Sequence, residues 1–193
     1  NLSSGRMGFA IARACRQAGA EAVLVAGPTA LPTPMGVTRI DVTTAEQMHR
    51  AVMRELDAGR FDVFVAVAAV ADWRVANRSA SKLKKTEGGG PPALEFAQNP
   101  DILAEVARRP DAPWCVGFAA ESENLEANGA AKREKKGVPL LVGNIGHETF
   151  GRDENELLLI DAAGSRKLPR ASKNALAAEL VAEIATRLPK ARA

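Results

Sequence analysis

A serine- and glycine-containing turn opens the first helical pattern of the chain. Residues 3–8 read SSGRMG and lead into apolar side chains that recur at helical spacing. Glycines at a helix start let backbone N–H groups approach a phosphate, and the helix dipole favours the negative charge. The hydroxyls of Ser3 and Ser4 could add donors or could simply cap the helix. The pattern by itself therefore leaves phosphate binding and a plain N-cap open.

Two later segments are rich in cations. Residues 74–92 follow the strongest apolar run, and carboxyl ends of strands are where ligands bind in open α/β sheets. We interpret this segment as a flap that closes over an anionic substrate, with a solvated basic loop as the alternative. In the second segment, Lys132 and Lys136 lie one turn apart on one helix face, where cations also suit the helix dipole. The basic residues of both segments are Arg74, Arg78, Lys82, Lys84, Lys85, Lys132, Arg133, Lys135 and Lys136.

The positive charge of the chain is local. Its 193 residues include 26 basic and 23 acidic ones, a formal net charge of +3. Nine basic residues lie in the two segments, which leaves 17 basic against 23 acidic residues elsewhere. Cationic clusters on an acidic body indicate a polyanionic small ligand, such as a nucleoside triphosphate, rather than a nucleic acid.

The composition excludes several function classes. The chain has no Tyr and only 4% aromatic residues, which rules out a tyrosine acid or nucleophile and argues against a base-stacking platform. Two His and two Cys cannot make a zinc site of ordinary spacing. Cys15 and Cys115 lie in apolar stretches, so we expect buried free thiols and a cytoplasmic protein. No apolar run approaches the roughly 20 residues that cross a bilayer, so no membrane partner is expected.

Short apolar runs alternate with helical patterns along the chain, which predicts an α/β fold with a mostly parallel sheet and helices on both faces. The run 61–71 is expected as a central strand buried on both faces, and Pro100 in the first turn of a helix. We expect strands at 21–26, 37–42, 61–71, 93–96, 114–119 and 139–142, helices at 5–18, 44–58, 99–108, 122–136 and 171–188, and a small C-terminal hairpin from 157–160 and 167–168.

In α/β folds a glycine turn that opens a helix normally follows the first parallel strand. No such strand precedes residues 5–8 here. We therefore expect residues 1–193 to form a single nucleotide-binding domain that is truncated before its first strand.

Six short motifs occur in order along nearly the whole chain. They are Asn1-x-Ser3-Ser4-Gly5-x-Met7-Gly8, Ala68-Ala69-Val70-Ala71-Asp72, Lys82-x-Lys84-Lys85, Asn99-Pro100-Asp101-Ile102, Gly117-Phe118-Ala119-Ala120-Glu121 and Lys132 to Lys136. In this order they closely resemble the phosphopantothenoylcysteine synthetase (phosphopantothenate–cysteine ligase) family. In bacteria such a domain is usually the C-terminal half of a bifunctional coenzyme A biosynthesis protein.

The resemblance implies a Rossmann-like fold, a homodimer and a two-step ligase reaction. CTP and 4′-phosphopantothenate would give an acyl-cytidylate and pyrophosphate, after which the amine of L-cysteine attacks the acyl carbon and releases CMP. Mg²⁺ would accompany the triphosphate. The fused decarboxylase domain of the bifunctional protein is absent from these residues, so FMN is not expected here.

The resemblance also assigns roles to residues. Lys82 would neutralise charge that develops during acyl transfer, and Asn1 would handle the acyl-cytidylate. Asp72 is also the expected metal ligand, directly or through water. The Ser3, Ser4, Gly5 and Gly8 turn would hold phosphates by backbone N–H groups. The expected CTP-binding set is Asp72, Lys82, Asn99, Pro100, Asp101, Ile102, Phe118, Lys132 and Lys136.

Two other functions fit parts of the sequence. An NAD(P)-dependent oxidoreductase would use the glycine turn, with Asp41 on a ribose hydroxyl, but that class generally needs a Tyr-x-x-x-Lys pair. A non-catalytic nucleotide-binding module would keep the turn without needing a cationic flap.

Overall fold

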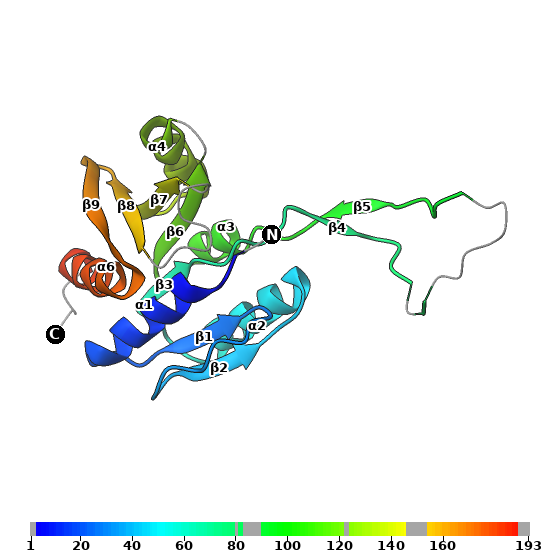
Figure 1. The fold of residues 1–193 in the computed structure, drawn as a ribbon, viewed down its shortest axis with the longest axis horizontal. Helices are drawn as coiled ribbons and strands as arrows, with labels where there is room; N and C mark the ends of the chain where they lie inside the picture. The colour runs from blue at the N-terminus through cyan, green and yellow to red at the C-terminus, as the bar shows by residue number, and fades with distance from the viewer. Residues whose placement is uncertain (1–2, 80, 83–89, 122–123, 146–153, 189–193) are drawn as a thin grey trace.

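The computed structural model describes residues 3–79, 81–82, 90–121, 124–145 and 154–188. Helices and strands alternate along most of the chain (Figure 1). The elements are α1 (Arg6–Gln17), β1 (Val23–Ala26), β2 (Thr38–Asp41), α2 (Ala45–Ala58), β3 (Val63–Ala66), β4 (Trp73–Val75), β5 (Phe96–Gln98), α3 (Ile102–Ala107), β6 (Trp114–Glu121), α4 (Leu125–Lys136), β7 (Leu140–Ile145), β8 (Glu154–Asp161), β9 (Gly164–Ser172) and α6 (Lys173–Arg187).

The strands form one large sheet and two small ladders. The large sheet has the order β3-β6-β7-β8-β9, in which β3, β6 and β7 run parallel and β8 and β9 run antiparallel. Strands β1 and β2 pair in parallel, and β4 and β5 pair antiparallel. The predicted α/β class is confirmed, but the strands do not all join one sheet.

The core has two faces because β6 and β7 are covered on both sides. Val116 and Leu140 belong to a buried cluster with side chains of α1 and α6. Their neighbours Cys115 and Leu141 belong to a second cluster with α2 and α3. Successive strand residues thus point to opposite helical layers, which is the pattern of a sheet buried on both faces.

Strand β3 differs from its prediction. It covers only Val63–Ala66 of the run 61–71, and all four residues are half-buried. Among the described residues it pairs with β6 alone, and β1 does not hydrogen-bond to it. The prediction of a fully buried central strand is therefore wrong: β3 is an edge strand of the five-stranded sheet, and its side chains, which contact both core clusters, stay half-buried.

The helix starts follow local chemistry. Thr44 caps α2 by accepting from the Gln47 N–H at 3.1 Å, and the Gln47 side chain returns the bond to the Thr44 N–H, which completes a capping box. Helix α1 starts instead from Gly5, whose φ of 74° suits glycine, without a side-chain cap. Helix α3 is capped by Asp101, so Pro100 precedes the cap rather than lying in the first turn as predicted.

None of the described helices combines the length and the apolar character that a transmembrane span requires.

The packing of α3 on the sheet requires a glycine in β6. A Cβ atom at Gly117 would lie 2.7 Å from Leu103 Cδ2 and 2.9 Å from Leu141 Cδ1, closer than carbon atoms approach. Gly117 is itself buried, so the two leucines meet over its bare backbone.

We therefore predict that Gly117→Ala lowers the free energy of unfolding by about 1–3 kcal/mol, the usual cost of overpacking. Urea unfolding followed by circular dichroism measures the change. Gly59→Ala is the matched control, since Gly59 has an extended backbone (φ −161°) and no atom lies within 4 Å of the place that its Cβ would take. Equal stability of the two variants would contradict the close-approach explanation.

Candidate functional site

Asn99 connects the segment after β3 to the start of α3. Its backbone N–H donates to the carbonyl of Asp72 at 2.8 Å, and its Nδ2 donates to the carbonyl of Ala71 at 2.8 Å. Its Oδ1 is buried and has no hydrogen-bond partner among the described residues. A buried acceptor of this kind is unusual, and a donor group of a ligand could satisfy it.

Asp101 connects α3 to α4. Its Oδ1 accepts from the Ala104 N–H at 3.2 Å, and its Oδ2 accepts from Lys136 Nζ. Partial burial acts to raise the pKa of Asp101, but the bonds from Lys136 and Ala104 outweigh it and hold the pKa below its usual range. At neutral pH the carboxylate is therefore ionised and keeps Lys136 oriented toward the start of α3.

The first turn of α1 lies beside the same segment after β3. A Cβ atom at Gly8 would contact Val67 at 3.9 Å. Ser3 and Ser4 are exposed, and Ser4 Oγ accepts a long 3.5 Å bond from the Arg6 N–H. Phe118 is half-buried against the core cluster that α1 joins, together with Met7 and Val67.

The structure thus brings together many of the predicted site residues through consecutive contacts: Gly8 with Val67, Ala71 and Asp72 with Asn99, and Asp101 with Lys136. Ile102 is buried in the α2–α3 face of the core, where it supports the start of α3. Lys132 is half-buried one turn before Lys136 on α4.

The predicted flap is partly a β-ribbon. Strands β4 and β5 form an arm, residues 73–79 and 90–98, that extends away from the body (Figure 1). Lys82 lies beyond β4 and is exposed, and among the described residues no hydrogen bond or ion pair joins it to Asn99 or Lys136. Asn1, Lys84 and Lys85 lie outside the described residues.

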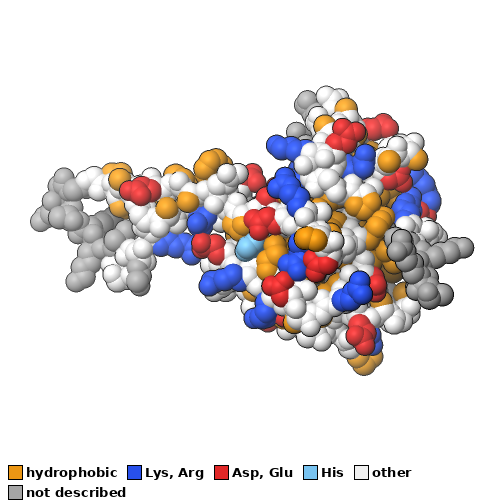
Figure 2. Space-filling view, turned by 180° about the vertical axis from the view of Figure 1, so that it is seen from behind, with side chains coloured by type: hydrophobic (Ala, Val, Ile, Leu, Met, Phe, Trp, Pro, Cys, Tyr) orange, Lys and Arg blue, Asp and Glu red, His pale blue; other side chains and the backbone are white. Residues whose placement is uncertain are grey.

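Sequence reasoning missed the apolar surface of this arm. Trp73 and Phe96 are 61% and 63% exposed, and Leu94 is also exposed. Strand β4 has only three residues, exposed Trp73 and then two half-buried ones, which is too short for an alternating pattern to indicate it in the sequence. Figure 2 shows the arm from behind, with acidic and basic side chains gathered where it meets the body.

Asp72, the predicted metal ligand, is exposed and lies at the base of the arm. Within the described ranges, no group of three or more His, Cys, Asp or Glu side chains could hold a metal ion. A single carboxylate is nevertheless compatible with Mg²⁺, which usually keeps several waters and binds through one or two carboxylates plus substrate phosphates.

The two cysteines are free thiols, as predicted. Cys115 is buried in the core, and burial raises the pKa of its thiol to about 11. Cys15 is half-buried, and burial likewise raises its pKa. Neither thiol is therefore activated as a nucleophile at neutral pH.

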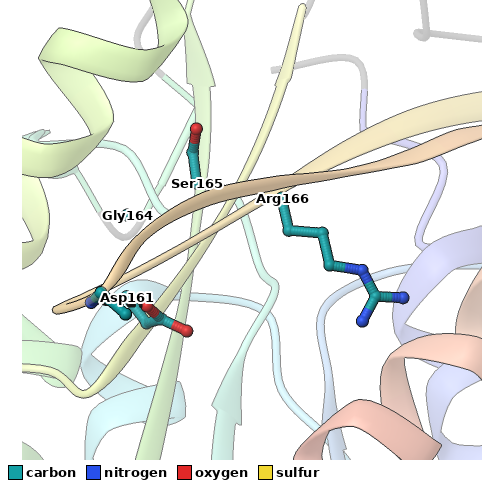
Figure 3. Close-up of a pocket in the computed structure, with 5 residues that line it drawn as sticks. Asp161, Gly164, Ser165 and Arg166 are labelled. Carbon is teal, nitrogen blue, oxygen red and sulfur yellow. Dashed lines mark hydrogen bonds between the residues drawn. The ribbon is translucent and has the colours of Figure 1, made fainter.

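An open cavity of about 170 Å³ lies elsewhere, at the turn between β8 and β9 (Figure 3). It is lined by Asp161, Ala163, Gly164, Ser165 and Arg166. Leu141, near the start of β7, pairs with Ile160 beside this turn. The cavity therefore lies near the amino ends of the parallel strands, away from the carboxyl ends where α/β sheets bind ligands.

We predict that Lys136→Met raises the pKa of Asp101, because the variant loses the ammonium that stabilises the ionised carboxylate. Carboxyl-carbon NMR titration of Asp101 measures the shift. Lys135→Met is the matched control, since it removes the same charge from the same turn of α4 without touching Asp101. An equal rise in both variants would attribute the effect to general charge rather than to the Lys136 contact.

The sign of the related stability change follows from the lowered pKa. The ionised Asp101 stabilises the folded protein above the ordinary pKa of an aspartate, and this contribution is lost as the pH falls through the lower, folded value. Lys136→Met should therefore weaken the dependence of stability on pH in the acid range.

Comparison with known proteins gives consistent matches. The family model described as "DNA/pantothenate metabolism flavoprotein C-terminal domain" matches residues 1–188. The coenzyme A biosynthesis bifunctional protein CoaBC of Vibrio cholerae is 42% identical over 185 residues, 94% of this chain and 46% of that protein. The Escherichia coli protein of the same name is 42% identical over 192 residues, 97% of this chain and 47% of that protein. The chain thus spans about half the length of these relatives.

Solved structures agree in fold. The crystal structure of the C-terminal domain of a CoaBC protein matches with a TM-score of 0.78 and 31% identity, covering 95% of this chain and 83% of that one. A Cab2 mutant in complex with phosphopantothenate-cysteine matches with a TM-score of 0.76 at 14% identity, covering 97% and 78% of the two chains, which shows the fold alone. The chain belongs to the family of the DNA/pantothenate metabolism flavoprotein C-terminal domain.

Proposed function

We propose that this protein is the phosphopantothenate–cysteine ligase of coenzyme A biosynthesis, with CTP as co-substrate. The observation that carries the proposal is the joined group of Asn99, Asp101 and Lys136, which places a cation and a buried acceptor beside the segment after β3. Relatives named for coenzyme A biosynthesis, at 42% identity, support the same activity.

The proposed reaction needs no protein nucleophile. An oxygen of the 4′-phosphopantothenate carboxylate attacks the α-phosphorus of CTP, and pyrophosphate leaves. The amine of L-cysteine then attacks the acyl carbon of the acyl-cytidylate, and CMP leaves as the new amide forms. The first step brings anions together, so cations that stabilise the developing charge lower its barrier.

The role proposed for each residue follows from its position. Lys132 and Lys136 would neutralise phosphates from α4, and the turn of Ser3 to Gly8 would donate backbone N–H groups at the start of α1. The CTP-binding set would also include the segment between these elements, Asn99, Pro100, Asp101 and Ile102. Lys82 on the flap would neutralise charge during acyl transfer, Asn1 would handle the acyl-cytidylate, and Phe118 would contact the nucleotide.

Asp72 would hold Mg²⁺ together with the triphosphate. Bound Mg²⁺ supplies charge neutralisation at the phosphates. The carboxylate of Asp72 fits that role because it sits at the base of the arm, next to the backbone bond with Asn99.

The finer features of fold and context are also proposals. We propose a single Rossmann-like domain that acts beside a decarboxylase domain in a longer polypeptide, in line with relatives about twice as long. FMN would then bind outside these residues. The two free thiols favour a reducing, cytoplasmic location.

The oxidoreductase alternative is weaker. Asp41 accepts from Arg39 Nε at 2.7 Å, so the carboxylate that would hold a ribose hydroxyl already has a partner. The absence of Tyr from the sequence removes the usual acid of that class. A non-catalytic nucleotide-binding module would predict binding of CTP without turnover.

We further propose that the protein is a homodimer in which a second copy covers the arm. A two-stranded ribbon is marginally stable alone, and this one exposes Trp73, Leu94 and Phe96 to solvent. Covering these side chains would remove apolar surface from water, the main source of stability in homodimer interfaces.

For the activity, we predict that the purified protein in its full natural length releases pyrophosphate from CTP only when 4′-phosphopantothenate is present, and CMP once L-cysteine is added. Coupled pyrophosphate detection and chromatography of nucleotides measure the two steps. Binding of CTP without turnover would favour the non-catalytic module, and hydride transfer to a nicotinamide would favour the oxidoreductase.

Lys82→Gln in the same assay tests the flap. We expect turnover to fall at least tenfold with little change in CTP affinity, because Lys82 would act on the transition state rather than on the bound nucleotide. Equal losses of turnover and affinity would make Lys82 a binding residue instead.

For the dimer, we predict that the protein sediments at twice its chain mass at micromolar concentration, and that Leu94→Asp or Phe96→Asp shifts it to the monomer. Met35→Asp is the control, since Met35 is 95% exposed outside the arm. A monomeric wild type, or a monomer produced equally by Met35→Asp, would contradict an interface on the arm.

A further inference from the structure

A short ladder holds the two strands of the arm together. Only three residue pairs form the β4–β5 ladder, with Trp73 opposite Gln98 and Val75 opposite Phe96. The bond from the Ala76 N–H to the Glu95 carbonyl, at 2.8 Å, extends the pairing outward. These bonds hold the two strands together, but they do not determine the direction in which the ribbon leaves the body.

Arg74 makes a contact across that junction. Its Nη1 donates to the Gln98 carbonyl on the opposite strand, and its Nε lies 3.3 Å from Glu46 Oε1 on the body. Glu46 belongs to the first turn of α2, where the Thr44–Gln47 capping box fixes the backbone. The Arg74 side chain is only 27% exposed, so its position is constrained.

These partners change the interpretation of Arg74 as one of the flap cations. Two N–H groups of its guanidinium already have partners: Nη1 faces a backbone carbonyl of the arm, and Nε faces a carboxylate of the body. A planar guanidinium can bridge two such acceptors in fixed directions, which a lysine ammonium does not reproduce. Arg74 therefore ties the arm to α2 instead of presenting a free charge to a ligand.

From this geometry we infer that Arg74, paired with Glu46, is a positioning residue that sets the direction of the arm and thereby delivers Lys82 to the acyl-transfer site. The inference rests on the proposed ligase function for its catalytic consequence. Its structural part, the anchoring of the arm, stands on the Arg74 contacts alone. Arg74 touches no proposed substrate group, and it acts through the ribbon that leads to Lys82.

The first measurement tests the anchor without activity. Trp73 precedes Arg74, so its fluorescence reports motion of the arm once Trp114, the other tryptophan, is replaced by Phe. In this background, Arg74→Met should lower the Trp73 anisotropy. Arg109→Met is the matched control, because it breaks the 2.8 Å ion pair of Arg109 with Asp57 on the same helix α2, away from the arm. Unchanged anisotropy in Arg74→Met would overturn the anchor.

The second measurement tests the delivery of Lys82. Arg74→Met should lower kcat by about tenfold to a hundredfold, the usual effect of a misplaced catalytic group, while KM for CTP stays within about twofold. Glu46→Gln should also lower kcat. The fold loss of kcat in the double variant should be smaller than the product of the two single fold losses. Arg74→Lys should not restore kcat, and Arg109→Met should leave it unchanged.

The outcomes separate this inference from the function on which it rests. A rise of KM in step with the fall of kcat would make Arg74 a direct phosphate ligand and overturn the positioning role. Multiplying effects of Arg74→Met and Glu46→Gln would also overturn it, since independent residues do not share one contact. A wild type without CTP turnover would overturn the ligase function and the delivery of Lys82, while the anisotropy would still decide the anchor.

Discussion

Burial of β6 and β7 on both faces is the constraint on which the rest of the structure depends. Val116 and Leu140 pack under α1 and α6, while Cys115 and Leu141 pack under α3. An interior of this kind leaves no place for an unpaired charge. Polar chemistry is therefore confined to strand ends, helix ends and the arm, and the charged and amide groups proposed for the site all lie there.

The close approach of the layers gives the site its geometry. Gly117 lets Leu103 of α3 rest directly on the sheet, which fixes where the start of α3 lies. Asp101 then uses one oxygen to cap that helix and the other to hold Lys136 of α4. A single carboxylate thus joins two helices that β6 separates in sequence, and it does so as an ionised group at neutral pH.

The arm differs from the body in where its apolar and polar side chains lie. Its apolar side chains point into solvent, and its connection to the body is polar, through Asn99 at its base and Arg74 with Glu46 beside α2. Partly exposed ion pairs are individually weak, about 1 kcal/mol or less, so they can orient a ribbon without making it rigid. That combination suits a segment that is proposed to close over a substrate and to meet a second copy of the chain.

The sequence by itself determined the α/β class, most helix positions and the free thiols, because periodicity and cysteine context act over a few residues. It also indicated the family through six motifs in order. Only the tertiary structure decided that β3 is half-buried, that β4 and β5 form a ribbon, and that Arg74 is held by Glu46. Those features depend on which distant segments meet, and a contact such as Lys136 with Asp101 joins groups that no local pattern relates.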